Sequence, residues 1–436
     1  MLAHNLFLAW KSLRKNPVLS LLMIGAIGMG IGVCMTTLTV YTLMSNNPIP
    51  QKSDVLYAVQ LDSWDPNEAW GEPNLPPSQL NWRDTQALLK SDIPKRQVAM
   101  FRSGFAVQEP SNKLPAFIAE ARVTTRDFFE MFDVPFIYGG GWDAPADRDQ
   151  QQLVVLTKKT NDKVFGGTDS VGKTLKLDDR EFRVVGVTED WKPTPKFYDL
   201  NNGSFAKPEE LYVPFGLIEP LQLKSFGNTN GWKPEQINSF QDFLNAEEIW
   251  LQYWAELPDT KTREAYQAFI DQYVREQKKL GRYPRPLNNR LTNVVDWMKV
   301  NEVVTEDAKV LLGLSFLFLA VCLLNIVGLL LSKFLGKSGE TALRRALGAT
   351  RLQIMQKNLV EVGLIGLLGG VLGLLLALAG LQGVKQLYRN YEKLVQLNGE
   401  LLLVALGIAL VSSLIAGLYP AWRAARLAPA GLLKTQ

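Results

Sequence analysis

The stretch "VLLGLSFLFLAVCLLNIVGLLL", Val310–Leu331, is a continuous apolar run without a charged side chain. About 20 apolar residues are enough for an α-helix to cross the roughly 30 Å of hydrocarbon in a bilayer. Three further apolar runs occur at Val18–Met44, Leu359–Leu381 and Leu401–Leu418. Four membrane-spanning helices are therefore predicted, although the mean hydropathy of the 436-residue chain is only −0.01.

The first run is predicted to remain as an anchor. Val18–Met44 is longer than the apolar region of a cleaved signal peptide, which has about 7 to 15 residues. The "MSNNPIP" that begins at Met44 offers no pattern of small residues for cleavage.

The distribution of Lys and Arg predicts the orientation of the chain. The N-terminal tail, the loop after the second run and the C-terminal tail hold twelve of them, with Glu340 as the single acid. The segment Ser45–Lys309 instead has 32 Lys plus Arg against 39 Asp plus Glu. By the positive-inside rule, both termini and the loop are predicted to be cytoplasmic and Ser45–Lys309 extracytoplasmic. The twelve basic residues are Lys11, Arg14, Lys15, Lys333, Lys337, Arg344, Arg345, Arg351, Lys357, Arg423, Arg426 and Lys434.

The predicted fold is an α-helical membrane protein with four transmembrane helices and a large mixed α+β extracytoplasmic domain between helices 1 and 2. Residues 1–44 hold the N-terminal segment and helix 1, residues 45–309 the domain, and residues 310–436 helices 2 to 4. Strand-like alternation and helix-like spacing both occur within 45–309. The charged amphipathic stretch 293–309 predicts that the second membrane helix extends outward as a stalk.

One stretch matches the residue pattern of a nucleotide-binding motif but lacks the flanking elements that such a motif requires. "GTDSVGKT", Gly167–Thr174, fits G-x-x-x-x-G-K-[ST] and would use Gly167, Gly172 and Lys173. A real phosphate loop joins a strand to a helix, whereas the flanking sequence here predicts a helix before the motif and a β-hairpin after it. We therefore interpret the motif as a glycine-rich connector on the side of the membrane away from ATP.

Residues for catalysis or metal binding are scarce. The chain has a single histidine, His4, ahead of the first apolar run, so a histidine-based metal or catalytic site is not expected. Cys34 and Cys322 both fall within apolar runs and are expected to pack as small apolar side chains. We expect no catalytic residue, cofactor or metal on this chain, and no nucleic-acid partner.

The loop after the second run contains a short basic amphipathic helix, predicted at about 338–349. In "SGETALRRALGATRLQI", Glu340 lies in the first turn and Gly348 is a candidate C-terminal cap. Ala342, Leu343, Ala346 and Leu347 share the apolar side. This helix could contact anionic lipid, or it could be a docking helix for a cytoplasmic protein.

Two other features leave alternatives open. Gly28 and Gly32 in the first run have the small-xxx-small spacing that permits close helix approach, with or without a dimer contact. The aromatic-rich region 190–255 could supply a binding surface or core packing, and the alternation in "IWLQYWAEL" favours core for at least half of its aromatic residues.

The loop helix and several other stretches resemble one family. "ETALRRALGATRLQI" resembles the cytoplasmic coupling helix of MacB/FtsX-family permeases, the macrolide-exporter class of ABC transporters, and "YPAWRAARLAPAGLLK" resembles their C-terminal ending. Residues 153–187, "RVTTRDFFEMFDVPFIYG" and "LYVPF" are similar to their extracytoplasmic core domain. The segment Thr341–Leu343 departs from the "IGI" that is more usual in the coupling helix.

The resemblance implies an inner-membrane permease that acts as a dimer with a second copy or a paralogue. ATP and Mg²⁺ would bind a separate cytoplasmic ATPase, and Glu340, Leu343, Arg344, Arg345 and Gly348 would lie at its contact. ATP-driven motion would reach the outer domain by mechanotransmission. Export of a small molecule, peptide or lipid-like substrate, with a periplasmic adaptor and an outer-membrane channel, is the preferred task.

Other tasks stay open at this stage. Within the family they are lipoprotein extraction and activation of cell-wall hydrolases. Outside it, the chain could be a membrane-anchored sensor, or a membrane ATPase that uses the nucleotide-binding motif itself.

Overall fold

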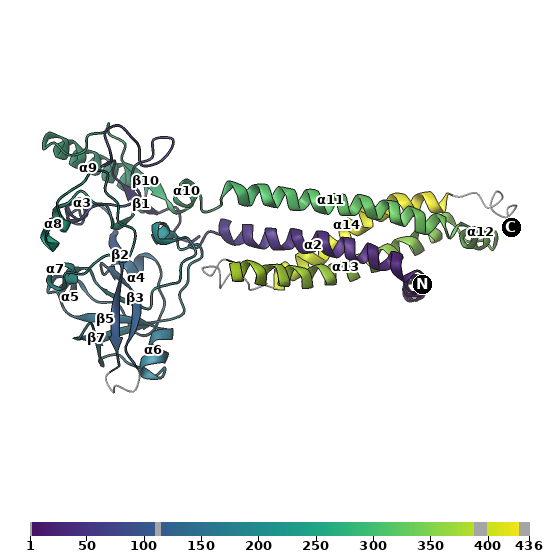
Figure 1. Ribbon diagram of the computed structural model, residues 1–436, viewed down its shortest axis with the longest axis horizontal. Coiled ribbons are helices and arrows are strands. Elements are labelled where there is room, and N and C mark those ends of the chain that lie inside the picture. Colours follow the sequence, from purple (N-terminus) through teal and green to yellow (C-terminus); the bar gives the residue numbers. More distant parts are fainter. Residues whose placement is uncertain (1, 110–114, 388–398, 427–436) are drawn as a thin grey trace. The chain divides into compact units, whose positions relative to one another are not determined.

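The computed structural model describes residues 2–109, 115–387 and 399–426, with side chains left undescribed at 2–4, 387 and 399–402 (Figure 1). The predicted basic residue Lys434, the end of the C-terminal motif after Arg426 and the His4 side chain lie outside this description. The chain forms two compact units. One consists of Met1–Ser45 and Val304–Gln436, and the other of Asn46–Val303.

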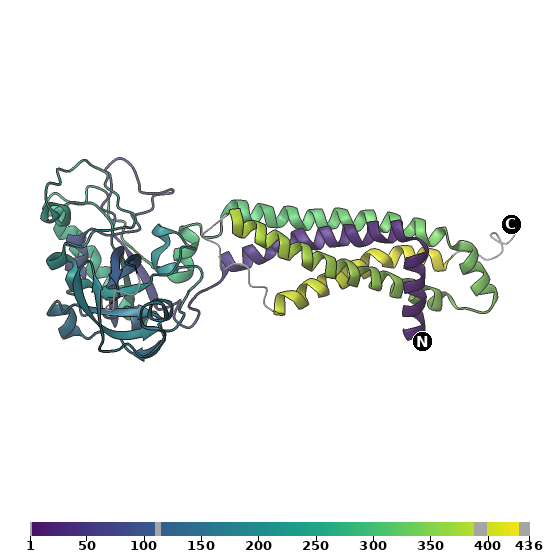
Figure 2. The ribbon, with the colours of Figure 1, turned by 60° about the horizontal axis from the view of Figure 1, so that its bottom comes forward.

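The first unit is a bundle in which four helices are long and apolar enough to cross a membrane. α2 contacts α11, α13 and α14, and the long helices lie side by side in two views (Figures 1 and 2). The four apolar runs of the sequence coincide with these helices, so the four-helix prediction is confirmed. The helices of this unit are α1 Leu2–Lys15, α2 Pro17–Ser45, α11 Glu306–Leu335, α12 Ser338–Ala346, α13 Arg351–Leu387 and α14 Gly399–Ala425.

The second unit is built on one mixed ten-stranded sheet, which confirms the predicted α+β class. The strands follow the order β10-β1-β9-β2-β3-β8-β5-β7-β4, and β6 pairs with β2 and β7. Most neighbours are antiparallel, but β3–β8 and β5–β7 are parallel. The strands are β1 Leu56–Gln60, β2 Arg96–Gln108, β3 Phe117–Thr124, β4 Phe136–Gly139, β5 Leu153–Thr157, β6 Thr174–Leu177, β7 Arg180–Thr188, β8 Leu211–Pro214, β9 Gln252–Glu256 and β10 Arg290–Asn293.

Both faces of the sheet are covered, because side chains alternate along each strand. In β2, Ala99 and Phe101 join the core under α3 and α9, whereas Val98 and Met100 join the core under α4 and α10. The helices of this unit are α3 Trp82–Leu88, α4 Phe128–Met131, α5 Ala144–Arg148, α6 Lys158–Phe165, η1 Phe197–Asn202, η2 Phe215–Leu217, α7 Ile218–Leu221, α8 Phe240–Asn245, α9 Thr260–Lys279 and α10 Val294–Val300.

The expected continuous stalk helix is interrupted. α10 ends at Val300, and α11 begins at Glu306, where the Thr305 hydroxyl accepts a hydrogen bond from the amide of Ala308. Between the two helices, Glu302 has a positive φ of 49°. Such a residue ends a helix, and the charged amphipathic pattern continued across this break without signalling it.

The nucleotide-motif stretch has the order helix, loop, hairpin. α6 ends at Gly166, whose φ of +66° forms a left-handed C-cap, and strand β6 starts directly after Lys173. The Lys173 ammonium lies 5.4 Å from the Phe165 ring centroid and 3.4 Å from the Thr168 hydroxyl oxygen. In this stretch no helix begins after the Lys to direct its N-terminus at a phosphate.

The aromatic-rich region is mostly core. Trp250, Tyr253 and Trp254 are buried, and Trp191 packs against the core that contains Tyr198. Within this region, residues Phe197–Leu200 of segment η1 are also buried.

Candidate functional site

α12 is a two-turn helix in the connection between α11 and α13. It ends at Leu347, and the amides of Gly348 and Ala349 donate to the carbonyls of Arg345 and Arg344 at 3.1 and 3.0 Å. Gly348 has a φ of +97°, which side chains with a Cβ rarely adopt. The structure therefore uses Gly348 to terminate the helix and turn the chain toward α13.

Glu340 fixes α12 to α13 through ion pairs. Its carboxylate lies 3.1 Å from the Arg344 guanidinium one turn later and 3.1 Å from the Lys357 ammonium on α13. Partial burial raises the pKa of Glu340, but the hydrogen bond and charge of Lys357 and the charge of Arg344 outweigh it and lower the pKa overall. Arg344 is thus held in place by its neighbours while its helix remains at the surface.

The apolar side of α12 is largely uncovered. Of its four predicted members only Ala342 is buried, whereas Leu343 and Leu347 are 55% and 80% exposed and Ala346 is also exposed. Two exposed leucines beside two arginines form a surface that suits either a protein or the apolar edge of a membrane.

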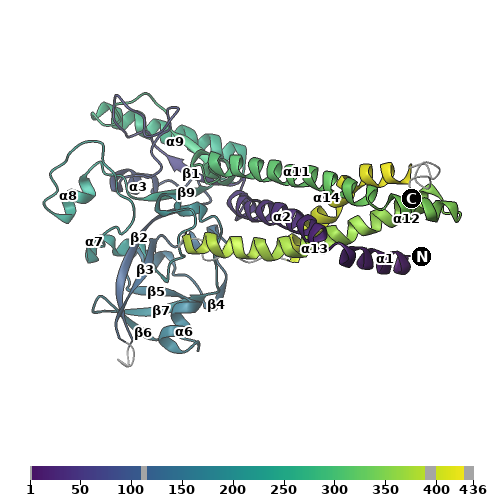
Figure 3. The same cartoon turned by 45° about the vertical axis from the view of Figure 1, so that its right-hand side comes forward.

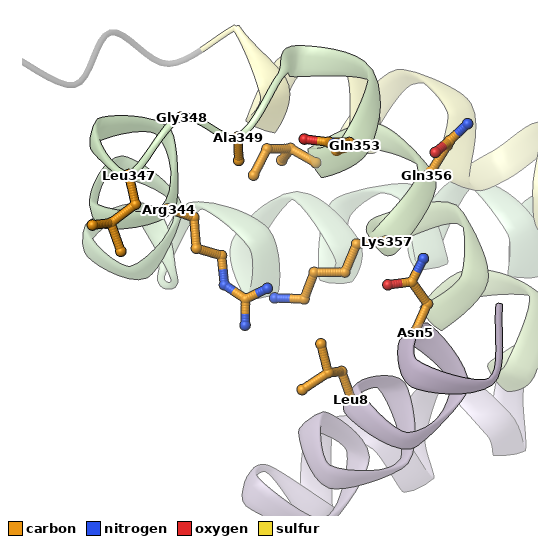
Figure 4. Close-up of a pocket in the computed structure, with 10 residues that line it drawn as sticks. Asn5, Leu8, Arg344, Leu347, Gly348, Ala349, Gln353, Gln356 and Lys357 are labelled. Atoms are coloured by element: carbon orange, nitrogen blue, oxygen red, sulfur yellow. The ribbon is translucent and has the colours of Figure 1, made fainter. Parts of the chain in front are cut away.

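A groove of about 650 Å³ lies between α1 and the α12–α13 turn (Figure 4). Asn5 and Leu8 of α1 form one wall, and Arg344, Leu347 and Lys357 lie on the other. The site predicted from the sequence does not include α1, because the prediction treats this segment only as a basic tail. The 3.6-residue spacing of its apolar residues is the signal that would have shown a helix there.

The same unit holds a partly buried ion cluster, and we call Ser12, Lys333, Lys337 and Glu361 the membrane ion cluster. The Lys333 ammonium is 2.8 Å from the Glu361 carboxylate, and both side chains are buried. The Ser12 hydroxyl donates to Glu361 and accepts from Lys337, whose ammonium is 3.7 Å from Glu361. The cluster joins α1, α11 and α13, and α1 contacts α13 (Figure 3). Lys333 was expected in an exposed basic loop and instead lies inside the bundle.

Gly28 and Gly32 lie against α13 of the same chain. A Cβ at Gly28 would lie 2.8 Å from Leu372, and one at Gly32 would lie 2.8 Å from Leu376. The small side chains therefore serve close approach of α2 and α13 within the protomer.

Models of two known protein families match residues in both units of the chain. The model of the MacB-like periplasmic core domain matches residues 20–273, and that of the FtsX-like permease C-terminal region matches residues 312–429. The macrolide export ATP-binding/permease protein MacB of Syntrophobacter fumaroxidans is 23% identical over 346 residues, which are 70% of this chain and 46% of MacB. The chain thus spans about half the length of this curated relative.

Solved structures that the comparison matches to this chain include the periplasmic region of MacB from Actinobacillus actinomycetemcomitans. That match has 15% identity and a TM-score of 0.38, and covers 59% of this chain and 97% of that one. The extracellular domain of the noncanonic ABC-type transporter YknZ from Gram-positive bacteria has 12% identity and a TM-score of 0.35, with coverages of 55% and 100%.

The two matched models follow the order of the chain, in which the sheet domain precedes the later apolar helices. The periplasmic core model alone accounts for more than half of the residues. The chain belongs to the MacB/FtsX family of ABC transporter permeases.

Proposed function

We propose that this chain is the non-catalytic membrane subunit of an ABC transporter, and that a separate cytoplasmic ATPase docks on α12. ATP and Mg²⁺ would bind that ATPase, and its closure would move α12 and, through α11 and α2, the outer domain. In this proposal the chain works as a dimer and transmits motion by mechanotransmission. The substrate does not pass through the four helices.

One observation carries the proposal, namely the chemistry of the α12 surface. Leu343 and Leu347 are exposed on either side of Arg344 and Arg345, and Gly348 and the Glu340–Lys357 ion pair hold the helix in a defined position. An exposed apolar contact with fixed guanidinium groups beside it suits a protein surface that carries carboxylates. A helix braced in this way can also transmit a displacement to α13.

The proposed topology places both termini and α12 in the cytoplasm and the sheet domain in the periplasm. The excess of basic residues in the three short segments supports this orientation. The task we propose is export of a small molecule, peptide or lipid-like substrate from the periplasmic side, with an adaptor and an outer-membrane channel. A gene for an adaptor beside the gene for this chain would support export, whereas a cell-wall hydrolase gene there would contradict it.

The docking proposal is tested by purifying the tagged chain from its own cells in mild detergent and measuring the ATPase that accompanies it. Arg344→Glu together with Arg345→Glu should reduce the retained ATPase at least about 10-fold, because carboxylates would face carboxylates. The matched control is Arg148→Glu with Lys159→Glu, which makes the same charge change on exposed residues of the sheet domain. Equal ATPase retention in the two variants would contradict docking on α12.

A further inference from the structure

Asn325 is a polar residue at an unexpected place in α11. It lies within the apolar run Val310–Leu331, and its side chain is exposed on the surface of the bundle. Among the residues that the structure describes, its carboxamide has no hydrogen-bond partner. At 1.5 Å per residue it lies about 12 Å along the helix from Lys333, well inside the hydrocarbon.

Its neighbours on the same face of α11 are apolar or small. Leu317 and Leu324 are 61% and 71% exposed, and Val321 and Gly328 are exposed one turn on either side of Asn325. A Cβ at Gly328 would meet no atom within 4 Å, so none of the described residues covers this position. Lipid tails could cover the leucines, but they offer nothing to a carboxamide that needs hydrogen bonds.

The hydroxyls of Thr42 and Ser412 on membrane helices do not have this problem. The exposed Thr42 hydroxyl donates to the Leu38 carbonyl at 2.8 Å, and the Ser412 hydroxyl donates to the Ile408 carbonyl. A hydroxyl can be satisfied by its own helix in this way. The Asn325 carboxamide, with two N–H donors and an oxygen acceptor, is left without such a bond.

We propose that the exposed face of α11 around Asn325 and Gly328 packs against the same face of a second copy of this chain, with the two Asn325 carboxamides hydrogen-bonded to each other. A carboxamide both donates and accepts, so it is complementary to itself across a two-fold axis. The absence of a side chain at Gly328 lets the two backbones come close. Leu314, Leu317, Val321, Leu324 and Gly328 follow the alternating three- and four-residue spacing of a helix-pairing face.

The proposal rests on the dimer of the proposed function and assigns its contact in the membrane. It is tested in native membranes by cysteine crosslinking with copper phenanthroline, in a chain with Cys34→Ala and Cys322→Ala. Asn325→Cys and Val321→Cys should give a covalent homodimer, because disulfides require Cα atoms within about 7 Å. The control is Leu375→Cys, a 60% exposed position on α13, which should stay monomeric. Equal crosslinking at all three positions, or a product that contains a different polypeptide, would overturn the proposal.

A second measurement does not depend on cysteine geometry. Asn325→Leu keeps the side-chain size and removes the hydrogen bond, and should raise the dimer dissociation constant about 3- to 30-fold. The thermal stability of the isolated protomer should not fall, since the carboxamide makes no bond within it. An unchanged dissociation constant would overturn the proposal. ATPase retention is scored separately through the α12 variants, so failure here leaves the docking result intact.

Discussion

Each of the two units buries a cluster of charged side chains, but the clusters are built differently. In the sheet domain, the outer ion cluster consists of Arg122, Lys196, Asp199 and Glu209, and its two positive charges match its two negative charges. The Arg122 guanidinium donates to both carboxylates, and the Lys196 ammonium lies 2.7 Å from Glu209. The membrane ion cluster instead has two lysines for the single carboxylate of Glu361.

The hydrogen bonds around the two clusters also differ. In the outer cluster, Glu209 accepts a further hydrogen bond from Tyr198 at 2.9 Å, and Asp199 accepts one from Asn202 at 2.7 Å. These bonds tie η1 and the residues before β8 to strand β3 in one fixed arrangement. The membrane cluster relies on Ser12 and Ser20, which come from α1 and α2.

This difference indicates separate roles. A neutral, fully hydrogen-bonded cluster fixes one structure, whereas a cluster with one excess positive charge can exchange partners at lower cost. The excess lies beside α12, where the proposed function requires movement. We therefore expect the sheet domain to move as a rigid body and rearrangement to occur near α12.

The largest expected effect comes from breaking the outer cluster. Arg122→Met should lower the free energy of unfolding of the sheet domain by about 3–5 kcal/mol, because two buried carboxylates would lose their main partner. Urea unfolding of the purified chain followed by tryptophan fluorescence measures this, since nine of the eleven tryptophans lie within 46–303.

Arg102→Met is the matched control on the neighbouring strand β2. The Arg102–Glu120 pair is partly exposed, so its loss should cost less than about 1 kcal/mol. If the two variants unfolded at the same urea concentration, the outer cluster would not hold the domain together.

Breaking the membrane cluster should have a smaller effect. Glu361→Gln leaves the buried Lys333 without its carboxylate, but this lysine is near the end of α11 and can reach toward water. We expect a loss of about 2 kcal/mol, measured as a lower melting temperature of the bundle in detergent. Adding Lys333→Met should restore most of it, and a double variant no more stable than Glu361→Gln would contradict the pairing.

Acid should weaken the sheet domain through Glu209. Burial raises the pKa of Glu209, but the charges of Arg122 and Lys196 lower it well below its usual range. The stabilisation is therefore complete above the unfolded-state pKa of about 4.3 and is lost as pH falls further. Below that pH, the free energy of unfolding should fall about 1.4 kcal/mol per pH unit more steeply than in Glu209→Gln. If the free energy of urea unfolding fell equally steeply between pH 4.5 and 3 in the unchanged chain and in Glu209→Gln, this prediction would be contradicted.

The sequence predicted these regions unequally. Long apolar runs and charge asymmetry depend on local composition, so the four helices and the inserted domain could be predicted directly from the sequence. Arg122 lies 77 and 87 positions from Asp199 and Glu209, and the pairing of β3 with β8 brings it close to them. Lys333 looked like one more basic loop residue, because Glu361, its partner, lies 28 positions later inside an apolar run. The helix α12 could be predicted because its residues are contiguous, and its contact with an ATPase stays a prediction.

The smallest expected effect on the free energy of unfolding is that of Glu340→Gln, in the region near α12 where we expect movement. Glu340→Gln removes partly exposed ion pairs with Arg344 and Lys357, so the free energy of unfolding should fall by no more than about 0.5 kcal/mol. The pKa of Glu340 is lowered in the folded chain, so its small contribution is present above about pH 4.3 and lost below it.

ATPase stimulation by the reconstituted complex should nevertheless decline several-fold in Glu340→Gln, because α12 would no longer be braced against α13. Lys158→Gln, which removes an exposed pair with Asp162 in the sheet domain, should alter neither quantity. A Glu340→Gln complex with full ATPase stimulation would show that the brace between α12 and α13 does not carry the coupling.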